Sequence, residues 1–588
     1  MDINQRRQIR DGIFGVLGRD PGKGSLSNAA RVLGCVPQFT THAPTFALAV
    51  CSAGQQAIGS ASLATSANGQ LLVASIGVIE EATPGAAAQF ALESYERHGP
   101  NFVEHLHGFF AIVVWDARQQ RVLLCADRCA GVCGLYFHEG AGGLSFGTAA
   151  KAVVALPGVP RKMDRGALED MLVLAHPVPP DTLFAGVKQV PAGCMLDAVA
   201  GQPPRLTRYW ERRPGATTHA SMAEIESGYM TALATAVDRA SAYRRPPAVL
   251  LSGGVDSAAI VALLRAAGHE HIVTYTLDAD EADTSDRDTA ARVATLFGTE
   301  HRVVALPGAS SVDALPSIVW HLEMPAPHVH PFFHLCAEVR HEHDVVLGGY
   351  GNDLVWGVAW AHSQGAPAER AARYLAARRM LPRQALARLL AGAAPTDDAL
   401  AARIARAVPH CDDEREDAIS LDEGLFGDQR VMRELGAIAT AAHGLWVQSP
   451  YSFASVVAAA ESVPLGARAS RTGAGGLELK AFFKALVDGR RLLPSDIIYR
   501  RKQWVRSPLE AWLRSDLGAR IEHLILQGPA RERALFDLAV VQHVMNAHRS
   551  GRADFGELLM MLAGVELWHR LFVDPAVLAP PDHNMIWV

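Results

Sequence analysis

The sequence predicts an α/β protein with a β-rich N-terminal domain, residues 1–212, and a doubly wound parallel-sheet domain, residues 218–588. Between residues 71 and 210 short apolar runs recur with turn residues between them, which is typical of antiparallel strands. From about residue 220 short apolar strands alternate with helical segments, the pattern of a parallel sheet covered by helices. Beyond residue 365 the chain is rich in Ala, Arg and Leu, which favour a helical C-terminal half.

The N-terminal domain is expected to hold a helix over 87–99, AAQFALESYERHG, among its strands. Each expected strand is a run of apolar and β-branched residues bounded by turn residues. The segment THASMAEIESG (218–228) is the expected linker into the second domain. The expected strands are LLVASIGVI (71–79), FFAIVVWD (109–116), RVLLCADR (121–128), LYFHE (135–139), LSFGT (144–148) and GCMLDAV (193–199).

The second domain is expected to open with four short strands separated by helices. Helices are predicted over 257–268, 288–298 and 311–323. In a sheet of this kind the ligand binds at the carboxyl ends of the strands, where the strand order reverses. The expected strands are PAVLL (247–251), HIVTYTL (271–277), HRVVAL (301–306) and DVVLGG (344–349).

Composition excludes several classes of protein. The chain has 588 residues, of which 49% are apolar and 20% charged, so it can bury sizeable cores and is not a disordered chain. Lys and Arg number 55 against 61 Asp and Glu, with no basic cluster, so nucleic acid is not an expected partner. No window approaches the ~18 apolar residues of a membrane span, and MDINQRRQIRD lacks the apolar core of a secretory signal. We therefore expect a cytoplasmic protein.

The string LLSGGVDS (250–257) lies between an apolar strand and a helix. Two glycines let the backbone turn tightly and present bare N–H groups to an anion, and the following helix adds its positive end. Hydroxyls can donate to phosphate oxygens, and the Asp supplies a carboxylate for Mg²⁺. SGGxDS is the pyrophosphate loop of enzymes that split ATP into AMP and pyrophosphate. The residues expected to bind ATP here are Ser252, Gly253, Gly254, Asp256 and Ser257.

A second glycine-rich turn, GGYGND (348–353), ends the fourth expected strand. If the first and fourth strands are neighbours, Asp353 lies across the same phosphates from Asp256. The two carboxylates can then share Mg²⁺, so both are predicted metal ligands.

These motifs resemble the asparagine synthetase family, which pairs SGGxDS with a later GEGADE-like turn and a basic string near the C-terminus. Here YRRKQ (499–503) is similar to that string, and Lys502 falls where the family binds pyrophosphate. Lys480, in ELKAFFKAL, falls near a second phosphate-contacting lysine. The resemblance also implies that Leu250, Gly348 and Gly349 contact ATP, the adenine and ribose region included.

Residues 108–154, TLFAGVKQVPAG (182–193) and RYW (208–210) resemble the family's glutaminase domain. The resemblance implies an Ntn-glutaminase-like sandwich followed by an ATP-pyrophosphatase-type synthetase domain. Family glutaminases begin with a cysteine in the string CGIxG, whose thiol attacks glutamine while the terminal amine acts as base. The matching string here is DGIFG, with Asp11 in place of the cysteine and ten residues before it, and the amide-binding NGE string appears as SIG (75–77). Glutamine hydrolysis is therefore predicted to be lost.

Two branches of this family keep an inactive glutaminase domain and use an amine already present in the substrate: the β-lactam synthetases and the lasso peptide cyclases. The turn GYGND resembles these branches, with Tyr350 where asparagine synthetases carry Glu. In β-lactam synthetases that Tyr works with a later Glu, but RRMLPRQALARLL (378–390) offers no acid. The length and the enlarged helical half favour a lasso cyclase.

The predicted function is that of an ATP-dependent ligase which adenylates an Asp or Glu side chain of a core peptide. The peptide's N-terminal amine then closes a macrolactam, with release of AMP and pyrophosphate. Catalytic roles are assigned to Tyr350, Lys480 and Lys502, with ATP and Mg²⁺ as cofactors. The expected partners are the precursor peptide, its leader peptidase and leader-recognition proteins. The alternatives are β-lactam formation and ammonia-dependent asparagine synthesis, and a non-catalytic scaffold is disfavoured.

A run of histidines between two core strands remains without a role in this scheme. No pair has the HExxH pattern, so packing or the lining of an acceptor pocket is favoured over metal binding. The run comprises His328, His330, His334, His341 and His343.

Overall fold

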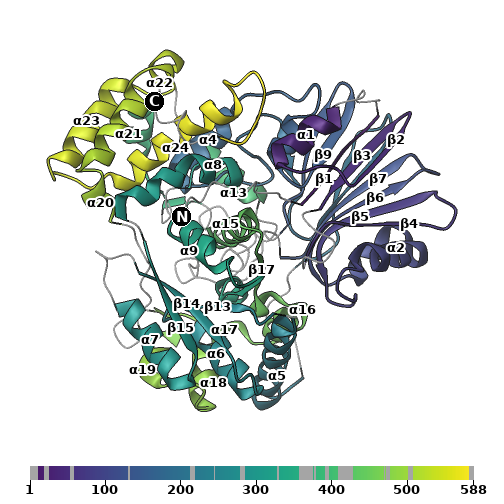
Figure 1. Cartoon of the computed structure of the whole chain (residues 1–588), viewed down its shortest axis with the longest axis vertical. Helices are drawn as coiled ribbons and strands as arrows, with labels where there is room; N and C mark the ends of the chain where they lie inside the picture. Colours follow the sequence, from purple (N-terminus) through teal and green to yellow (C-terminus); the bar gives the residue numbers. More distant parts are fainter. Residues whose placement is uncertain are drawn as a thin grey trace.

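A computed structural model gives the fold of the chain (Figure 1). The residues that the structure describes are 11–18, 25–52, 59–129, 133–211, 219–243, 245–278, 285–306, 308–326, 330–356, 372, 375–376, 379–390, 396–407, 428–468, 470–471, 477–500 and 508–581.

Two antiparallel six-stranded sheets form the N-terminal part, in the orders β10-β8-β9-β1-β3-β2 and β12-β11-β7-β6-β5-β4. Successive side chains along each strand point to opposite faces, so that every second side chain faces the other sheet and the rest face outward. Ile13 and Leu17 of β1 share a cluster with Ala111 and Val113 of β6, and Phe46 of β3 stacks on Trp115 of β6 with ring centroids 4.2 Å apart. The strands are β1 (Gly12–Leu17), β2 (Phe39–Ala43), β3 (Phe46–Cys51), β4 (Ser62–Thr65), β5 (Leu71–Ile79), β6 (Gly108–Asp116), β7 (Arg121–Ala126), β8 (Tyr136–Gly140), β9 (Gly143–Gly147), β10 (Val187–Gln189), β11 (Cys194–Val199) and β12 (Arg205–Arg208).

Helices cover the outer faces of these sheets. The helices α1 (Ser25–Leu33) and α3 (Ala150–Val154) pack on the first sheet, and α2 (Ala87–His98) packs on the second. In Figure 1 α1 and α2 lie on opposite sides of the two sheets. The strands expected from the sequence and the helix over 87–99 are all present, with ends that shift by one or two residues.

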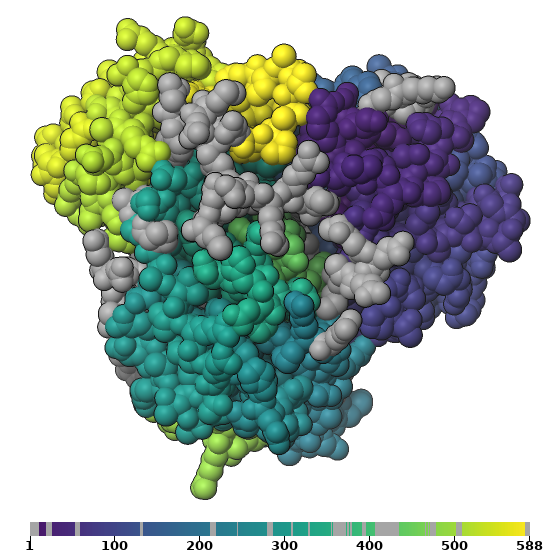
Figure 2. Space-filling model, in the orientation of Figure 1, coloured from purple at the N-terminus to yellow at the C-terminus, as the bar shows by residue number. Residues whose placement is uncertain are grey.

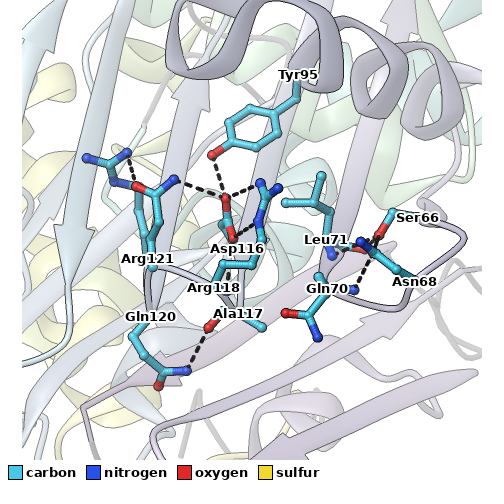
Figure 3. Close-up of polar contacts among 11 residues, drawn as sticks. Ser66, Asn68, Gln70, Leu71, Tyr95, Asp116, Ala117, Arg118, Gln120 and Arg121 are labelled. Atoms are coloured by element: carbon cyan, nitrogen blue, oxygen red, sulfur yellow. Dashed lines mark hydrogen bonds and ion pairs between the residues drawn. The ribbon is translucent and has the colours of Figure 1, made fainter.

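The β6–β7 hairpin is held by a buried carboxylate, Asp116, at its turn (Figure 3). Arg118 donates to both Asp116 oxygens, with Nε 2.9 Å from Oδ1 and Nη2 2.7 Å from Oδ2, and the Tyr95 hydroxyl of α2 donates to Oδ2 at 3.2 Å. Burial by itself raises the pKa of Asp116, but the hydrogen bonds and the charge of Arg118 hold it below its usual value. This contact ties α2 to the turn of the second sheet.

The second part is built on a five-stranded sheet in the order β15-β14-β13-β16-β17, in which all neighbouring strands are parallel. The strands are β13 (Ala248–Leu250), β14 (Val273–Asp278), β15 (Glu300–Ala305), β16 (Val345–Leu347) and β17 (Trp446–Gln448). The four expected strands are confirmed. The fifth strand, β17, was not predicted: it is as short as β13 and β16 but, unlike them, is not followed by a glycine-rich turn that marks its end.

Helices cover both faces of this sheet, as the strand–helix alternation predicts. One face packs against α5 (Met222–Ser241), α6 (Val255–Ala266), α7 (Ser285–Phe297), α16 (Ala454–Glu461) and α18 (Ala481–Gly489). The other face packs against α9 (His330–Val339) and α15 (Asp428–Ala442). The linker prediction is wrong from Met222 onward, because Ser221 and Glu224 form a capping box that starts α5 there.

The helical character predicted beyond residue 365 is confirmed in the described residues. Helices α20 (Leu509–Trp512) to α24 (Gly556–Phe572) form a group next to the sheet domain, and Figure 1 shows them together at the upper left. Between α20 and α24 in the chain, this group holds α21 (Asp516–Leu526), α22 (Pro529–Arg533) and α23 (Leu538–Arg549). Other helices beyond residue 365 are α12 (Arg383–Leu389), α13 (Asp397–Ala407), α17 (Leu465–Arg468) and α19 (Ser495–Ile498), and α8 (Leu315–Leu322) and α10 (Asn352–Trp356) precede them in the chain. In the described part of the chain no helix has both the length and the apolar character needed to cross a bilayer.

The N-terminal part and the C-terminal helices share one hydrophobic cluster, which includes residues of α3, of α4 (Arg165–Leu174), of α8 and of α24. Figure 2 shows the C-terminal residues, in yellow, directly against the N-terminal residues, in purple. Arg161 donates to the carbonyl oxygens of Phe572, Val573 and Ala576 at 3.2, 3.1 and 3.2 Å, at the end of α24. The two parts therefore pack as one body.

Candidate active site

The two glycine-rich turns lie side by side because β13 and β16 are neighbours, with Ala248 opposite Val346 and Val249 opposite Leu347. From β13 the chain adds β14 and β15 on one side of the sheet and then β16 and β17 on the other side. The strand order therefore reverses between β13 and β16. Ligands of doubly wound sheets bind at this point, beyond the carboxyl ends of the strands. The neighbour relation on which the predicted Asp256–Asp353 pairing depends is confirmed.

The first turn needs its glycine. Gly253 has φ +70°, and a Cβ there would lie 2.5 Å from the carbonyl oxygen of Asp286. Helix α6 begins at Val255, two residues before the expected start, and Gly254 caps it without a side-chain bond. The positive helix end and its free N–H groups therefore face the site, as an anion requires.

The two serines of this turn play different parts. The buried Ser257 hydroxyl accepts from the Ser252 backbone N–H at 3.1 Å and donates to the Gly254 carbonyl at 3.3 Å, so it shapes the turn. The Ser252 side chain is exposed, with its hydroxyl 3.2 Å from that of Ser257. Ser252 is thus the serine whose position suits contact with a bound anion.

Asp256 is fixed by three neighbours from distant parts of the chain. Asn352 Nδ2 donates to Oδ1 at 2.7 Å, Lys480 Nζ donates to Oδ2 at 2.6 Å, and the Tyr451 hydroxyl donates to its backbone carbonyl at 2.8 Å. The side chains of Asn352 and Lys480 are almost completely buried. The carboxylate is therefore held in one orientation.

Lys480 joins the two turns, because its Nζ also lies 2.7 Å from Asp353 Oδ1. Burial alone lowers the pKa of Lys480, but the two carboxylates outweigh burial and raise it above its ordinary value. Its backbone is left-handed, with φ 57° and ψ 34°, an uncommon conformation for a residue with a side chain. The sequence placed Lys480 at the phosphates by resemblance, and the structure brings it between the two predicted metal ligands.

Further contacts hold Asn352 in place, a residue for which no role was predicted. Trp356 Nε1 donates to Asn352 Oδ1 at 2.8 Å, and the buried Arg468 guanidinium lies over the Trp356 ring, 5.5 Å from its centroid. Arg468 Nη1 donates to the Val355 carbonyl at 2.8 Å. Asn352, Tyr451 and Arg468 were missed because their partners lie about a hundred or more residues away in the sequence.

Tyr350 lies in the second turn, half-buried, with its ring edge-to-face against Phe332 at 5.8 Å between centroids. The Ser449 hydroxyl donates to the Tyr350 carbonyl. Burial raises the pKa of the Tyr350 phenol further above its ordinary value, so the phenol holds its proton more firmly than a free tyrosine does. In this conformation the phenol can orient a substrate amine by hydrogen bonding but is a weak base.

The other predicted contacts are distributed as follows. Leu250 is buried in the cluster on the α9 face of the sheet. Gly349 packs against α6, since a Cβ there would lie 2.9 Å from Asp256 Cβ. Gly348 is buried, and a Cβ would lie 2.4 Å from the Tyr350 ring. Lys502 lies outside the described residues.

Two carboxylates from adjacent turns, beside a helix N-terminus, are donors of the kind Mg²⁺ uses together with substrate phosphates. The residues fit this ion as two of its ligands. Among the residues that the structure describes, no three His, Cys, Asp or Glu side chains gather to form a complete metal site.

In the N-terminal part, Asp11 directly precedes β1, a strand within the first sheet. The backbone N–H of Ala61 donates to Asp11 Oδ2 at 2.9 Å. Gly77, the last residue of the SIG string, donates its N–H to the Gly59 carbonyl at 2.9 Å. An Asp carboxylate held in this way is not a nucleophile suited to amide hydrolysis.

Three histidines of the run between the core strands pack against other parts of the chain, whereas His341 is exposed. His334 Nε2 lies 3.0 Å from the Ser311 carbonyl, and His343 Nδ1 lies 2.9 Å from the Pro246 carbonyl. His330 is fully buried near Trp512, with ring centroids 5.8 Å apart. Residues 327–329, which include His328, lie outside the described residues.

His443, next to this group, makes stability depend on pH. Its ring packs edge-on against Phe333, and burial lowers its pKa to about 3. In the unfolded chain His443 is protonated as the pH falls below about 6.5, whereas in the folded chain it stays neutral until about pH 3. The free energy of unfolding therefore falls as the pH drops below about 6.5. We expect His443 to cost about 2 kcal/mol at pH 5 relative to pH 7. Urea unfolding at the two pH values should show this loss in the wild type and a smaller loss in His443→Leu.

The exposed His543 provides the control, because His543→Leu should leave the pH dependence unchanged. Equal pH dependence in the wild type and in His443→Leu would contradict the assignment.

Comparison with known proteins identifies the family. The family model described as asparagine synthase matches residues 228–570, more than half of the chain, and a glutamine amidotransferase domain model matches residues 87–210. The chain belongs to the asparagine synthase family. Its members are ATP-dependent ligases that form amide bonds, and this member is accordingly an ATP-dependent amide ligase. The amidotransferase match begins at Ala87, the first residue of α2, and does not include Asp11.

Relatives of this asparagine synthase family member carry different activities in their names. A putative glutamine-hydrolyzing asparagine synthetase of Mycobacterium tuberculosis is 27% identical over 536 residues, 83% of this chain and 80% of the relative. Asparagine synthetase 3 of Bacillus subtilis is 28% identical over 293 residues, 46% of this chain and 47% of the relative. The carboxyethyl-arginine beta-lactam-synthase of Streptomyces clavuligerus is 31% identical over 286 residues, 47% of this chain and 51% of the relative.

Proposed function

We propose that this ligase joins a carboxylate and an amine of one substrate, a peptide, and so acts as a lasso peptide cyclase. The observation that carries the proposal is the contrast between its two parts. Asp256 and Asp353 are joined by Lys480 beside the helix N-terminus, whereas the string DGIFG resembles the CGIxG of the family's glutaminases with Asp11 in place of the nucleophile. Without ammonia from glutamine, the amine comes from another source, and in this proposal it is part of the substrate.

In this proposal the phosphates of ATP lie at residues 252–257, against the N-terminus of α6. Asp256 and Asp353 would hold Mg²⁺, which when bound would offset the charge that builds on the departing pyrophosphate. Lys480 and Lys502 add positive charge at the same place. Ser252 donates to a phosphate oxygen, and Leu250, Gly348 and Gly349 line the nucleotide side of the turns.

The carboxylate needs activation because its oxygen is a poor leaving group. Attack of the substrate carboxylate on the α-phosphorus of ATP gives an acyl-adenylate and pyrophosphate, and attack of the amine then releases AMP and one proton. Tyr350 orients the amine through its phenol. Holding the N-terminal amine and the activated side chain of the peptide together is the main task of the cleft, since correct positioning is worth up to ~7–11 kcal/mol.

The proposed substrate is a core peptide whose N-terminal amine joins an Asp or Glu side chain. Its suppliers are the leader peptidase and leader-recognition proteins that process the precursor, and the proposed location is the cytoplasm. A second candidate is β-lactam formation on a small amino acid derivative, favoured by the 31% identity to a beta-lactam synthase. Ammonia-dependent asparagine synthesis is the third.

The test is mass spectrometry of a co-expressed core peptide with and without this protein. We expect the peptide to lose the mass of one water, with the new bond mapped to its N-terminal amine and an acidic side chain. The pure protein should also release no glutamate from glutamine above background. Efficient conversion of aspartate and ammonium to asparagine, or glutamate release that Asp11→Ala abolishes, would contradict the proposal.

A further inference from the structure

One ammonium group occupies the position between the two carboxylates. Lys480 Nζ lies 2.6 Å from Asp256 Oδ2 and 2.7 Å from Asp353 Oδ1, and the residue is only 5% exposed. These two oxygens come from the turns after β13 and β16. The position that bridges the turns is therefore a cation position.

A divalent ion that bridges the same two oxygens would lie about 2.1 Å from each of them. It would then lie within bonding range of the ammonium, with no anion between the two cations. Two cations so close in a buried site repel each other strongly. Lys480 and a bridging metal ion thus exclude each other at these distances.

The structure also shows how Lys480 is directed to this position. Its left-handed backbone comes immediately before α18, and it follows the short strand β19 (Leu477–Glu478). Lys484, one turn further along α18, turns instead to Glu478. Lys480 and Lys484 therefore form ion pairs with different acidic residues, and of these two lysines it is Lys480 that lies between Asp256 and Asp353.

Charge balance decides what can displace the ammonium. Of the residues that the structure describes here, Asp256, Asp353 and Lys480 together carry a single net negative charge, which is too little to hold both the lysine and a divalent ion in a buried place. The phosphates of ATP add several negative charges and supply acceptors for the displaced ammonium, which forms strong hydrogen bonds with phosphate oxygens. Both cations are then compensated.

We propose that Lys480 and the divalent metal compete for one cation position, so that the metal enters only together with ATP, whose phosphates accept the ammonium. Lys480 is then a positioning residue that couples metal binding to nucleotide binding. This inference rests on the proposed role of Asp256 and Asp353 as metal ligands. It predicts that the full-length protein binds metal alone weakly.

The test measures Mn²⁺ binding to the full-length protein by electron paramagnetic resonance, with and without a non-hydrolysable ATP analogue. Without nucleotide, Lys480→Met should bind Mn²⁺ at least about 10-fold more tightly than the wild type, since a repelling charge is removed. With the analogue, wild-type affinity should rise and the difference should shrink. Lys484→Met is the matched control and should bind Mn²⁺ as the wild type does.

Two further variants make each result decisive. Lys480→Arg keeps the cation and should keep nucleotide-free Mn²⁺ binding weak. Adding Asp353→Asn to Lys480→Met should remove the gained binding. Because removal of the lysine leaves two carboxylates facing each other, Mg²⁺ should also raise the melting temperature of Lys480→Met more than that of the wild type.

The outcomes distinguish the competition between Lys480 and the metal from the metal site itself. Equal nucleotide-free Mn²⁺ affinity in the wild type and in Lys480→Met, with binding that still depends on Asp353, would overturn the competition but keep the metal site. Binding with the ATP analogue that is unaffected by Asp353→Asn would overturn the metal-site assignment itself, and with it the proposed function of these residues.

Discussion

Asp256→Asn and Asp353→Asn should each lower ATP–pyrophosphate exchange at least about 10³-fold, equivalent to ~4 kcal/mol of transition-state stabilisation. Asn is nearly isosteric with Asp, so Asn352 can still donate to an oxygen at position 256 and the turn keeps its shape. What is lost is one of the two negative charges that Lys480 contacts at 2.6 and 2.7 Å, and with it a proposed metal ligand. The measurement is exchange of labelled pyrophosphate into ATP with a substrate that supports exchange in the wild type.

Asp313→Asn is the control for this pair, because the Asp313 carboxylate forms a surface ion pair with Arg520 at 2.7 Å, with both side chains largely exposed. It should leave exchange near the wild-type rate. Exchange within a few-fold of wild type in either site variant would show that the two carboxylates do not serve the reaction.

Lys151→Met should lower the free energy of unfolding by about 3–5 kcal/mol. Lys151 Nζ of α3 lies 3.2 Å from Glu323 Oε1 and donates to the Trp320 carbonyl at 2.8 Å, and both charged side chains are almost completely buried. Removing the lysine leaves the Glu323 charge buried between the N-terminal part and α8. Urea unfolding measures the loss.

The double variant Lys151→Met/Glu323→Gln separates charge from packing. In the wild type the Ala150 N–H donates to Glu323 Oε2 at 2.8 Å. The oxygen of the neutral amide that Glu323→Gln introduces can accept the same hydrogen bond, and no unpaired charge remains. We expect it to recover at least half of the lost stability. A double variant as unstable as Lys151→Met would mean that the loss comes from the packing of the lysine stem instead.

Local sequence patterns were enough for most of the fold. The strand β5 is LLVASIGVI, as predicted, because nine apolar and small residues between turns have few other stable arrangements. The same holds for β13, α6, β14 and α7, whose alternation implied a parallel sheet. The helix starts at Met222 and Val255 and the short strand β17 were misjudged. The Ser221–Glu224 capping box is a local signal in the sequence, whereas β17 forms a strand through its pairing with β16.

The chemistry-bearing residues of the two turns were also readable in the sequence. A glycine at 253 followed by Asp256, and an acid at 353 after a strand, are local signatures of anion and metal binding. The string DGIFG, which resembles CGIxG with Asp11 in place of the cysteine, was equally visible, and in the structure the Asp11 carboxylate accepts from the Ala61 N–H. These features depend on residue type and short spacing alone.

Tertiary structure decided how these residues meet. The order of β13 and β16 placed Asp256 and Asp353 on adjacent turns, and only folding brought Lys480 between them, 224 residues from Asp256 along the chain. Asn352, Tyr451 and Arg468 gained their supporting roles in the same way. A sequence pattern reports the conformational preferences of neighbouring residues, whereas the position of a buried charge is set by which distant groups can compensate it, and that depends on the packing of the whole chain.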